Sequence, residues 1–343
     1  MTKEIWLLLD SSTFGGIESH VLELATGLKN RVNVRVVILN NVIDNPLAIK
    51  LKNNGVKTTL CHLGIVSFII MLCQTPPLLI HSHGYKSGIV SRIASLFFRF
   101  KTISTFHAGE SLNGKLKAYD WMDRHSARIS SHVFSVSSKI SERIPRKNEI
   151  IKNFIDTGKS KKSNGTQIAF VGRLSYEKGP DLFSEIAKRC RMRDFHMYGD
   201  GPMAKEIEQG RSKNLFLHGR QNEMDCVWKK IGILMVTSRA EGMPMVIIEA
   251  MSRGIPVISF DVGEVSHMID HGKNGWLCGQ ENIETMNDLL NQWLEYSPEE
   301  KRLISENAVN KANISFSTVA VLPRYVRVYE KFAPYVTVCE RRG

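Results

Sequence analysis

Residues 231–260, "IGILMVTSRAEGMPMVIIEAMSRGIPVISF", decide the fold of this chain. The apolar runs at the two ends have the length and composition of buried strands. Between them come a polar loop and a segment, Met245–Arg253, that we expect to be a helix, because Gly242 and Pro244 suit a helix entry. A strand, a crossover helix and a second strand predict a parallel sheet covered by helices.

Two carboxylates lie within this stretch with no charged residue between them. Glu241 falls in the loop at the carboxyl end of the first strand, where open α/β sheets bind ligands, and Glu249 about one turn inside the helix. The amides at the helix start favour an anion. Backbone amides that can bind a diphosphate, flanked by carboxylates that can accept hydrogen bonds from hydroxyl groups, suit a sugar nucleotide. The structural alternative is a capping glutamate and a surface glutamate.

The same alternation of apolar runs and helical patterns extends over the whole chain, and predicts an α/β fold with two doubly wound, Rossmann-like domains facing a central cleft. Residues 156–166, "DTGKSKKSNGT", contain no apolar residue and are interpreted as a linker. The domains are therefore expected at 1–155 and 156–343, with the last helix as a candidate for packing back on the first. The expected strands are Glu4–Asp10, Val34–Leu39, Val56–Cys61, Leu78–Ser82, Thr102–Phe106, Val133–Val136, Glu149–Ile151, Gln167–Val171, Phe195–Tyr198, Leu215–Leu217, Ile233–Thr237 and Pro256–Phe260.

Three further segments place polar groups or glycines after expected strands. In "FVGRLSYEKGPDLF" (170–183), Arg173 and Lys178 could neutralise a leaving diphosphate, or could be solvated loop cations. Gly15 and Gly16 follow the first strand without forming a GxGxxG motif, so an ordinary turn is an equal alternative. His107 ends the fifth strand, where a structural role competes with a catalytic one.

Charge is distributed unevenly along the chain. Residues 1–153 hold 20 Lys and Arg against 10 Asp and Glu, whereas the remainder holds 26 against 24. This asymmetry predicts an anionic partner for the first half. The basic segment "KSGIVSRIASLFFRFK" (86–101) is either a membrane-surface helix or a crossover helix packed on its sheet. Nucleic acid is disfavoured because no recognised motif is present.

Neither a signal peptide nor a membrane span is expected, and the six scattered cysteines suggest reduced thiols without a metal knuckle. We therefore expect a cytoplasmic protein. A second expectation is that it contacts the inner face of the plasma membrane as a peripheral protein.

The segment "EGMPMVIIEAMSRGIPVISFDVGE" closely resembles the Glu-x7-Glu signature of retaining glycosyltransferases of family 4, which have the GT-B fold. "FVGRLSYEKGPDLF" is similar to that family's diphosphate segment, and "MYGDGPM", "LHGR", "HGKNGWL" and "IIKNFID" resemble its landmarks in the usual order. In the first domain the Gly-Gly loop, His107 and "VSSKI" match, whereas residues of about 40–100 match nothing recognisable. The acceptor therefore remains unassigned.

The resemblance implies a role for each matched residue. Glu249 would hold the ribose hydroxyls, Glu241 the hydroxyls of the transferred sugar, and Arg173 and Lys178 the diphosphate. His107 would line the sugar pocket. The catalytic residues implied are His107, Glu241, Arg173 and Lys178. The donor-binding residues implied are Gly15, Gly16, Arg173, Lys178, Gly199, Arg220, Glu241, Gly242, Met243, Pro244, Met245, Val246 and Glu249, with Gly199 and Arg220 beside the base.

The implied activity is that of a retaining, metal-independent hexosyltransferase (EC 2.4), and the sequence has no Asp-x-Asp motif. No cofactor is expected. The donor would be a nucleoside diphosphate sugar, a UDP-sugar or alternatively a GDP-sugar. The acceptor would be a glycan or lipid-linked molecule of polysaccharide or lipopolysaccharide assembly, with an anionic membrane surface and no nucleic acid as partner. Alternatives are a GT-B sugar-nucleotide epimerase or hydrolase, and a catalytically silent binding subunit.

Overall fold

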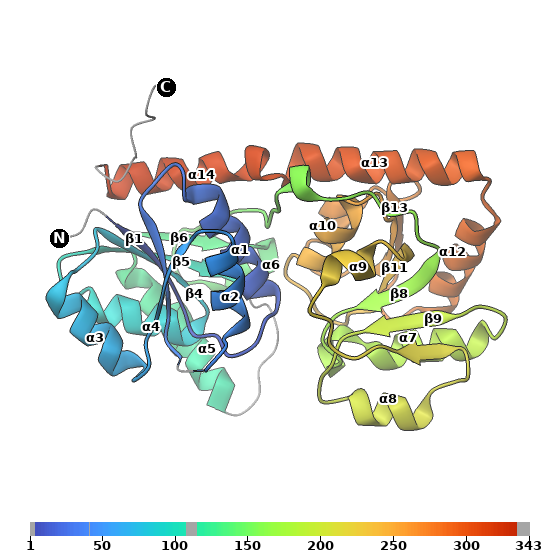
Figure 1. Ribbon diagram of the computed structural model, residues 1–343, viewed down its shortest axis with the longest axis horizontal. Coiled ribbons are helices and arrows are strands. Elements are labelled where there is room, and N and C mark those ends of the chain that lie inside the picture. The colour runs from blue at the N-terminus through green and yellow to red at the C-terminus, as the bar shows by residue number, and fades with distance from the viewer. Residues whose placement is uncertain (1–3, 41, 108–114, 335–343) are drawn as a thin grey trace. The chain divides into compact units, whose positions relative to one another are not determined.

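The computed structural model describes residues 4–40, 42–107 and 115–334 (Figure 1). These residues form two compact units. The first unit contains the described residues up to Phe154 together with those from Thr318 onward, and the second contains Ile155–Ser317. The chain therefore passes from one unit to the other twice.

The first unit is built on a seven-stranded parallel sheet in the order β3-β2-β1-β4-β5-β6-β7. The central strand β1 is buried along its whole length, because helices cover both faces. Ile5 pairs with Val34 of β2 on one side and with Leu79 of β4 on the other. The strands are β1 (Ile5–Leu9), β2 (Val34–Ile38), β3 (Lys57–Leu60), β4 (Leu79–His83), β5 (Lys101–Phe106), β6 (His132–Ser135) and β7 (Glu149–Ile150).

Alternate residues of β1 enter two different cores. Ile5, Leu7 and Leu9 pack with the helices α1 and α14, whereas Trp6 and Leu8 pack with α3 and α4. Figure 1 shows α14, in red, alongside the first sheet, although it follows the second unit in the sequence. The helices of this unit are α1 (Gly16–Leu28), α2 (Pro46–Asn53), α3 (Ile65–Gln74), α4 (Tyr85–Ala94), α5 (Lys115–Ser126), η1 (Ala127–Ile129), α6 (Ser138–Arg143) and α14 (Thr318–Phe332).

The second unit has a six-stranded parallel sheet in the order β10-β9-β8-β11-β12-β13. Its strands are β8 (Gln167–Val171), β9 (Phe195–Tyr198), β10 (Leu215–Leu217), β11 (Ile231–Val236), β12 (Val257–Phe260) and β13 (Gly275–Cys278). Its helices are η2 (Thr157–Lys159), η3 (Tyr176–Lys178), α7 (Pro180–Arg189), α8 (Ala204–Gly210), α9 (Met224–Trp228), α10 (Met245–Met251), α11 (Val265–Met268), α12 (Ile283–Glu295) and α13 (Pro298–Phe316).

The segment interpreted as a linker, 156–166, is packed on the second unit. The Ser163 hydroxyl donates to the carbonyl of Ile231 at 2.7 Å. A Cβ at Gly165 would lie 1.9 Å from the carbonyl carbon of Lys230, so the backbones are in close contact. The linker interpretation is therefore wrong for these residues, since polar composition here marks a packed surface segment.

The basic segment 86–101 contains the crossover helix α4 rather than a helix with one basic face. Arg92 is fully buried and pairs with Asp123, which is 5% exposed. Its guanidinium also donates to the Ser104 hydroxyl at 2.8 Å. Arg92 therefore cannot contribute to a membrane surface. Among the described residues, none of the helices is both long enough and apolar enough to cross a bilayer.

Candidate functional site

The loops that follow β8, β9 and β11 meet at the carboxyl edge of the second sheet, where neighbouring parallel strands end. Two glycines allow their backbones to touch. Gly179 has φ +64°, and a Cβ there would lie 2.0 Å from the carbonyl oxygen of Thr237. Gly199 has φ +144°, and its Cβ would lie 1.7 Å from the carbonyl oxygen of Gly172. The close approach fixes the loops that carry the predicted site residues.

Lys178 and Glu241 form an ion pair across two of these loops. The ammonium of Lys178 donates to Oε1 of Glu241 at 2.7 Å and to Oε2 at 2.8 Å. Ser238 adds a hydroxyl donor to Oε1 at 2.7 Å. The Glu241 side chain is 7% exposed and that of Lys178 is 29% exposed. The structure therefore brings these two predicted residues together, with the carboxylate oriented by two donors.

Arg239 holds the same two loops together, and sequence reasoning missed it. Its guanidinium makes a bidentate contact with Asp181, at 2.9 and 2.6 Å, and stacks 4.2 Å from the ring centroid of Tyr176. Its backbone N–H donates to the carbonyl of Glu177, next to Lys178. Burial raises the pKa of Asp181, but the hydrogen bonds and charge of Arg239 outweigh it and hold that pKa below its ordinary value. A charged residue three positions after the end of a buried strand was the available signal.

Arg173 and Arg220 are exposed, and neither guanidinium has a hydrogen bond or ion pair within the described part of the chain. Arg173 directly follows Gly172 in the loop after β8, and Arg220 follows Gly219 in the loop after β10. Both cations are thus available to an anion. Glu249 lies in α10 and is half-buried.

At the start of α10, the groups available to a ligand are mainly those of the backbone rather than side chains. Met243, Pro244 and Met245 are buried, whereas Gly242 and Val246 are half-buried. Pro244 caps the helix without a side-chain hydrogen bond. Of the residues predicted at this helix start, the two methionines can therefore reach a ligand only through their main chain.

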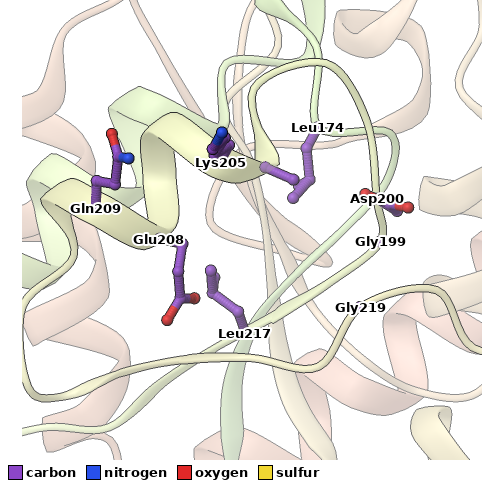
Figure 2. Close-up of a pocket in the computed structure, with 9 residues that line it drawn as sticks. Leu174, Gly199, Asp200, Lys205, Glu208, Gln209, Leu217 and Gly219 are labelled. Carbon is purple, nitrogen blue, oxygen red and sulfur yellow. The ribbon is translucent and has the colours of Figure 1, made fainter.

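A pocket lies beside the loops that follow β9 and β10 (Figure 2). The N–H of Gly199 donates to the carbonyl of Gly219 at 3.0 Å, which joins the two loops. The sequence predicts that the nucleotide base lies near Gly199 and Arg220. Gly199 lines this pocket, and Arg220 directly follows the lining residue Gly219. The lining residues are Leu174, Gly199, Asp200, Ala204, Lys205, Glu208, Gln209, Leu217 and Gly219.

The remaining predicted residues lie in the first unit. Gly15 precedes α1, and its N–H donates to Oε2 of Glu18 at 2.9 Å. Gly16 opens α1, and a Cβ there would meet no atom within 4 Å. His107 follows β5, and its Nε2 lies 3.0 Å from Nδ1 of His83. Burial is the main cause that holds the pKa of His107 well below its ordinary value, and the neighbouring His20 and His83 lower this pKa further. The imidazole of His107 is therefore neutral.

Comparison with known proteins gives the family. Residues 152–310 match the family described as "Glycosyl transferases group 1", and residues 14–159 match "Glycosyltransferase Family 4". The chain is a family 4 glycosyltransferase. The family that the sequence predicts is therefore confirmed.

Relatives of this glycosyltransferase include the UDP-Gal:alpha-D-GlcNAc-diphosphoundecaprenol alpha-1,3-galactosyltransferase of Escherichia coli. The two are 23% identical over 73% of this chain and 74% of that one. A glycosyltransferase of Methanocaldococcus jannaschii is 28% identical over 74% of this chain and 76% of that one.

Solved structures confirm the predicted fold class. HepE of Anabaena, in complex with UDP and glucose, has a TM-score of 0.84 at 19% identity and covers 96% of the glycosyltransferase and 100% of HepE. TarM has a TM-score of 0.78 at 15% identity, over 96% and 99% of the two chains. The two doubly wound parallel units are those of the GT-B fold.

Proposed function

We propose that this glycosyltransferase takes its sugar from a nucleoside diphosphate donor held by the loops after β8 and β11. The ion pair between Lys178 and Glu241, with Arg173 in the same loop as Lys178, is the observation that carries the proposal. Glu241 would accept hydrogen bonds from the transferred sugar and Glu249 from the ribose. Arg173 and Lys178 would bind the diphosphate.

The reaction proposed is a same-face displacement with retention. The bond between the anomeric carbon and the diphosphate oxygen breaks, and the acceptor oxygen bonds to that carbon from the same face. The acceptor proton passes to the departing phosphate oxygen, so no carboxylate nucleophile is required. Negative charge grows on the diphosphate, and Arg173 and Lys178 would stabilise it. We also propose that His107 acts on the transferred sugar.

The donor and acceptor are proposed from the relatives. The Escherichia coli relative is named for a UDP-galactose donor and a diphosphoundecaprenol acceptor, and HepE was crystallised with UDP-glucose. Another relative, from Staphylococcus aureus, is named as a poly(ribitol-phosphate) transferase. We therefore infer a UDP-sugar donor and a lipid-linked or polymeric acceptor of cell-surface glycan assembly, used on the cytoplasmic side of a membrane.

Exposed apolar residues support contact with that membrane. Leu96 and Phe97, just after α4, are 64% and 80% exposed, and the exposed Arg99 follows them. The helix α3 packs into the same core as α4 and exposes Val66 and Ile70. Apolar side chains beside basic ones are typical of reversible binding to anionic lipid.

A nucleotide panel tests the donor assignment. Thermal shift should increase with UDP or a UDP-sugar, and ¹H NMR of the transfer product should show the anomeric configuration of the donor. Inverted product would overturn the retaining mechanism. Release of free sugar or an epimer as the main product would favour the hydrolase or epimerase, and no nucleotide binding would favour a silent subunit.

Metal independence is tested on the same transferase assay. We expect full activity in EDTA, because the guanidinium of Arg173 and the ammonium of Lys178 would supply the positive charge that a divalent ion provides elsewhere. A strict requirement for added Mg²⁺ or Mn²⁺ would contradict this part of the proposal.

A further inference from the structure

Three histidines from three separate elements converge inside the first unit. His20 lies on α1, His83 ends β4 and His107 follows β5. Each offers a ring nitrogen within 4.8 Å of the other two. His20 and His83 are almost fully buried, and His107 is half-buried. No acidic side chain belongs to this group within the described residues, so the three rings are the only ligands it offers.

The distances suit a metal that prefers nitrogen ligands. Nδ1 of His83 and Nε2 of His107 are 3.0 Å apart, close to the separation of about 3.3 Å expected for two nitrogens at about 2.0–2.1 Å from a tetrahedral zinc ion. Ring centroids of His20 and His107 are 4.7 Å apart, which places the third imidazole against this pair.

A buried polar atom also lacks a partner here. Nε2 of His83 is buried without a hydrogen bond to any of the described residues. Because one imidazole offers one ion a single nitrogen, an ion on Nδ1 leaves the ring proton on Nε2, and an ordered molecule there would satisfy it.

We propose that His20, His83 and His107 form a binding site for one borderline transition-metal ion, of the Zn²⁺, Co²⁺ or Ni²⁺ class. Three neutral imidazoles favour these ions, whereas Mg²⁺ and Mn²⁺ prefer oxygen ligands. The site is therefore compatible with a transfer reaction that needs no Mg²⁺ or Mn²⁺. An open fourth position is typical of three-histidine zinc sites, and a water molecule or a ligand oxygen would occupy it.

A consequence for activity rests on the proposed function. If His107 acts on the transferred sugar, a metal bound to its ring withdraws that ring from the reaction, so Zn²⁺ should inhibit transfer and EDTA should reverse the inhibition. The binding measurements below do not depend on activity, so failure of the metal site and failure of the transferase assignment are separable.

The test is a Co²⁺ titration of the full chain without an affinity tag, because a polyhistidine tag binds the same ions. We expect one equivalent to bind with the intense visible absorption of a tetrahedral site, and Zn²⁺ to displace it. His20→Gln or His83→Gln should weaken binding by at least about tenfold, since loss of even outer-shell partners has that effect. Binding that is unchanged in both variants would overturn the proposal.

The pair His196 and His218 in the second unit is a matched control. Nδ1 of His196 lies 3.0 Å from Nε2 of His218, the same spacing without a third imidazole in the described residues. His196→Gln should leave the first equivalent of Co²⁺ intact, and loss of binding there would place the metal in the wrong unit.

X-ray absorption of the wild-type zinc complex decides the question even if the buried-histidine variants do not fold. Three imidazole ligands on one ion are expected. A shell of one imidazole with oxygen ligands would overturn the proposal.

Discussion

Lys178 is the side chain whose removal most directly tests the proposed donor site. Lys178→Ala takes away the charge proposed for the diphosphate and one of the two donors that orient Glu241. Because the charge on the diphosphate increases in the transition state, kcat should fall by about 10²–10³-fold while nucleotide affinity changes less. Steady-state kinetics with a UDP-sugar measures this, with Lys178→Arg as the charge-preserving comparison. A rise in KM alone would assign Lys178 to ground-state binding.

Arg239 is expected to position that site without touching the donor. Arg239→Gln removes the bidentate contact with Asp181 and should cost about 1.5–3 kcal/mol of unfolding free energy, because the lost hydrogen bonds are between charged groups. Since the backbone of Arg239 is bonded to Glu177, beside Lys178, the variant should also lower kcat.

Urea unfolding followed by a transferase assay measures both effects. Arg302→Gln is the control, because Arg302 is 59% exposed in an i,i+4 pair with Glu306 and its loss should change neither quantity appreciably. Equal behaviour of the two variants would remove Arg239 from the positioning role.

The conformation of the loop after β9 depends on Gly199, which has no side chain. Gly199→Ala adds a Cβ that would lie 1.7 Å from the carbonyl oxygen of Gly172, in the loop that also carries Arg173. The loops must separate, so nucleotide affinity should fall by about tenfold or more and the melting temperature should decrease. Isothermal titration with UDP and thermal unfolding measure this.

Gly210→Ala is the matched control for that loop. Gly210 ends α8, and a Cβ there meets nothing within 4 Å. We expect this variant to bind UDP like the wild type. If Gly199→Ala did the same, the contact between the two loops would have no part in the donor site.

Most of the strands could be predicted because a buried parallel strand is a continuous apolar run. β8, β9 and β10 begin and end at the predicted residues, and the bounds of the other nine predicted strands differ by one or two residues. β13 (Gly275–Cys278) was missed, because it directly follows the turn-forming residues "HGKN" and its four residues are too few to show a period.

The candidate site was harder to predict from the sequence than the sheet. Patterns at strand ends identified Lys178 and Glu241, but their mutual ion pair depends on two loops 63 residues apart in the chain. His20, His81 and His83 were not singled out, since clustering of rings from α1 and β4 is a tertiary property. Two histidines at alternate positions at the end of β4 were the signal available.

Binding of the whole molecule to anionic vesicles is the expected result of its charge and its exposed apolar side chains. We expect cosedimentation with vesicles containing anionic lipid at low salt, decreasing as added salt screens the charges. Phe97→Ser combined with Arg99→Ser should reduce it. Arg92 is left intact, because replacing it would leave Asp123 buried without its partner.

Met192→Ser provides the comparison for membrane binding. Met192 is 93% exposed but belongs to the second unit, so its loss should leave cosedimentation unchanged. Equal binding to neutral and anionic vesicles would contradict an electrostatic contribution from the first unit.

The double passage of the chain between the units has a consequence for biosynthesis. Leu322, Tyr325 and Tyr329 of α14 are buried in the core of the first unit, yet they are synthesised after the whole second unit. The second unit is continuous in sequence and can fold as soon as Ser317 has emerged. The nascent first unit, although translated first, would keep its α1-side core open until α14 has emerged, so a premature stop after Ser317 would leave the core of the first unit incomplete.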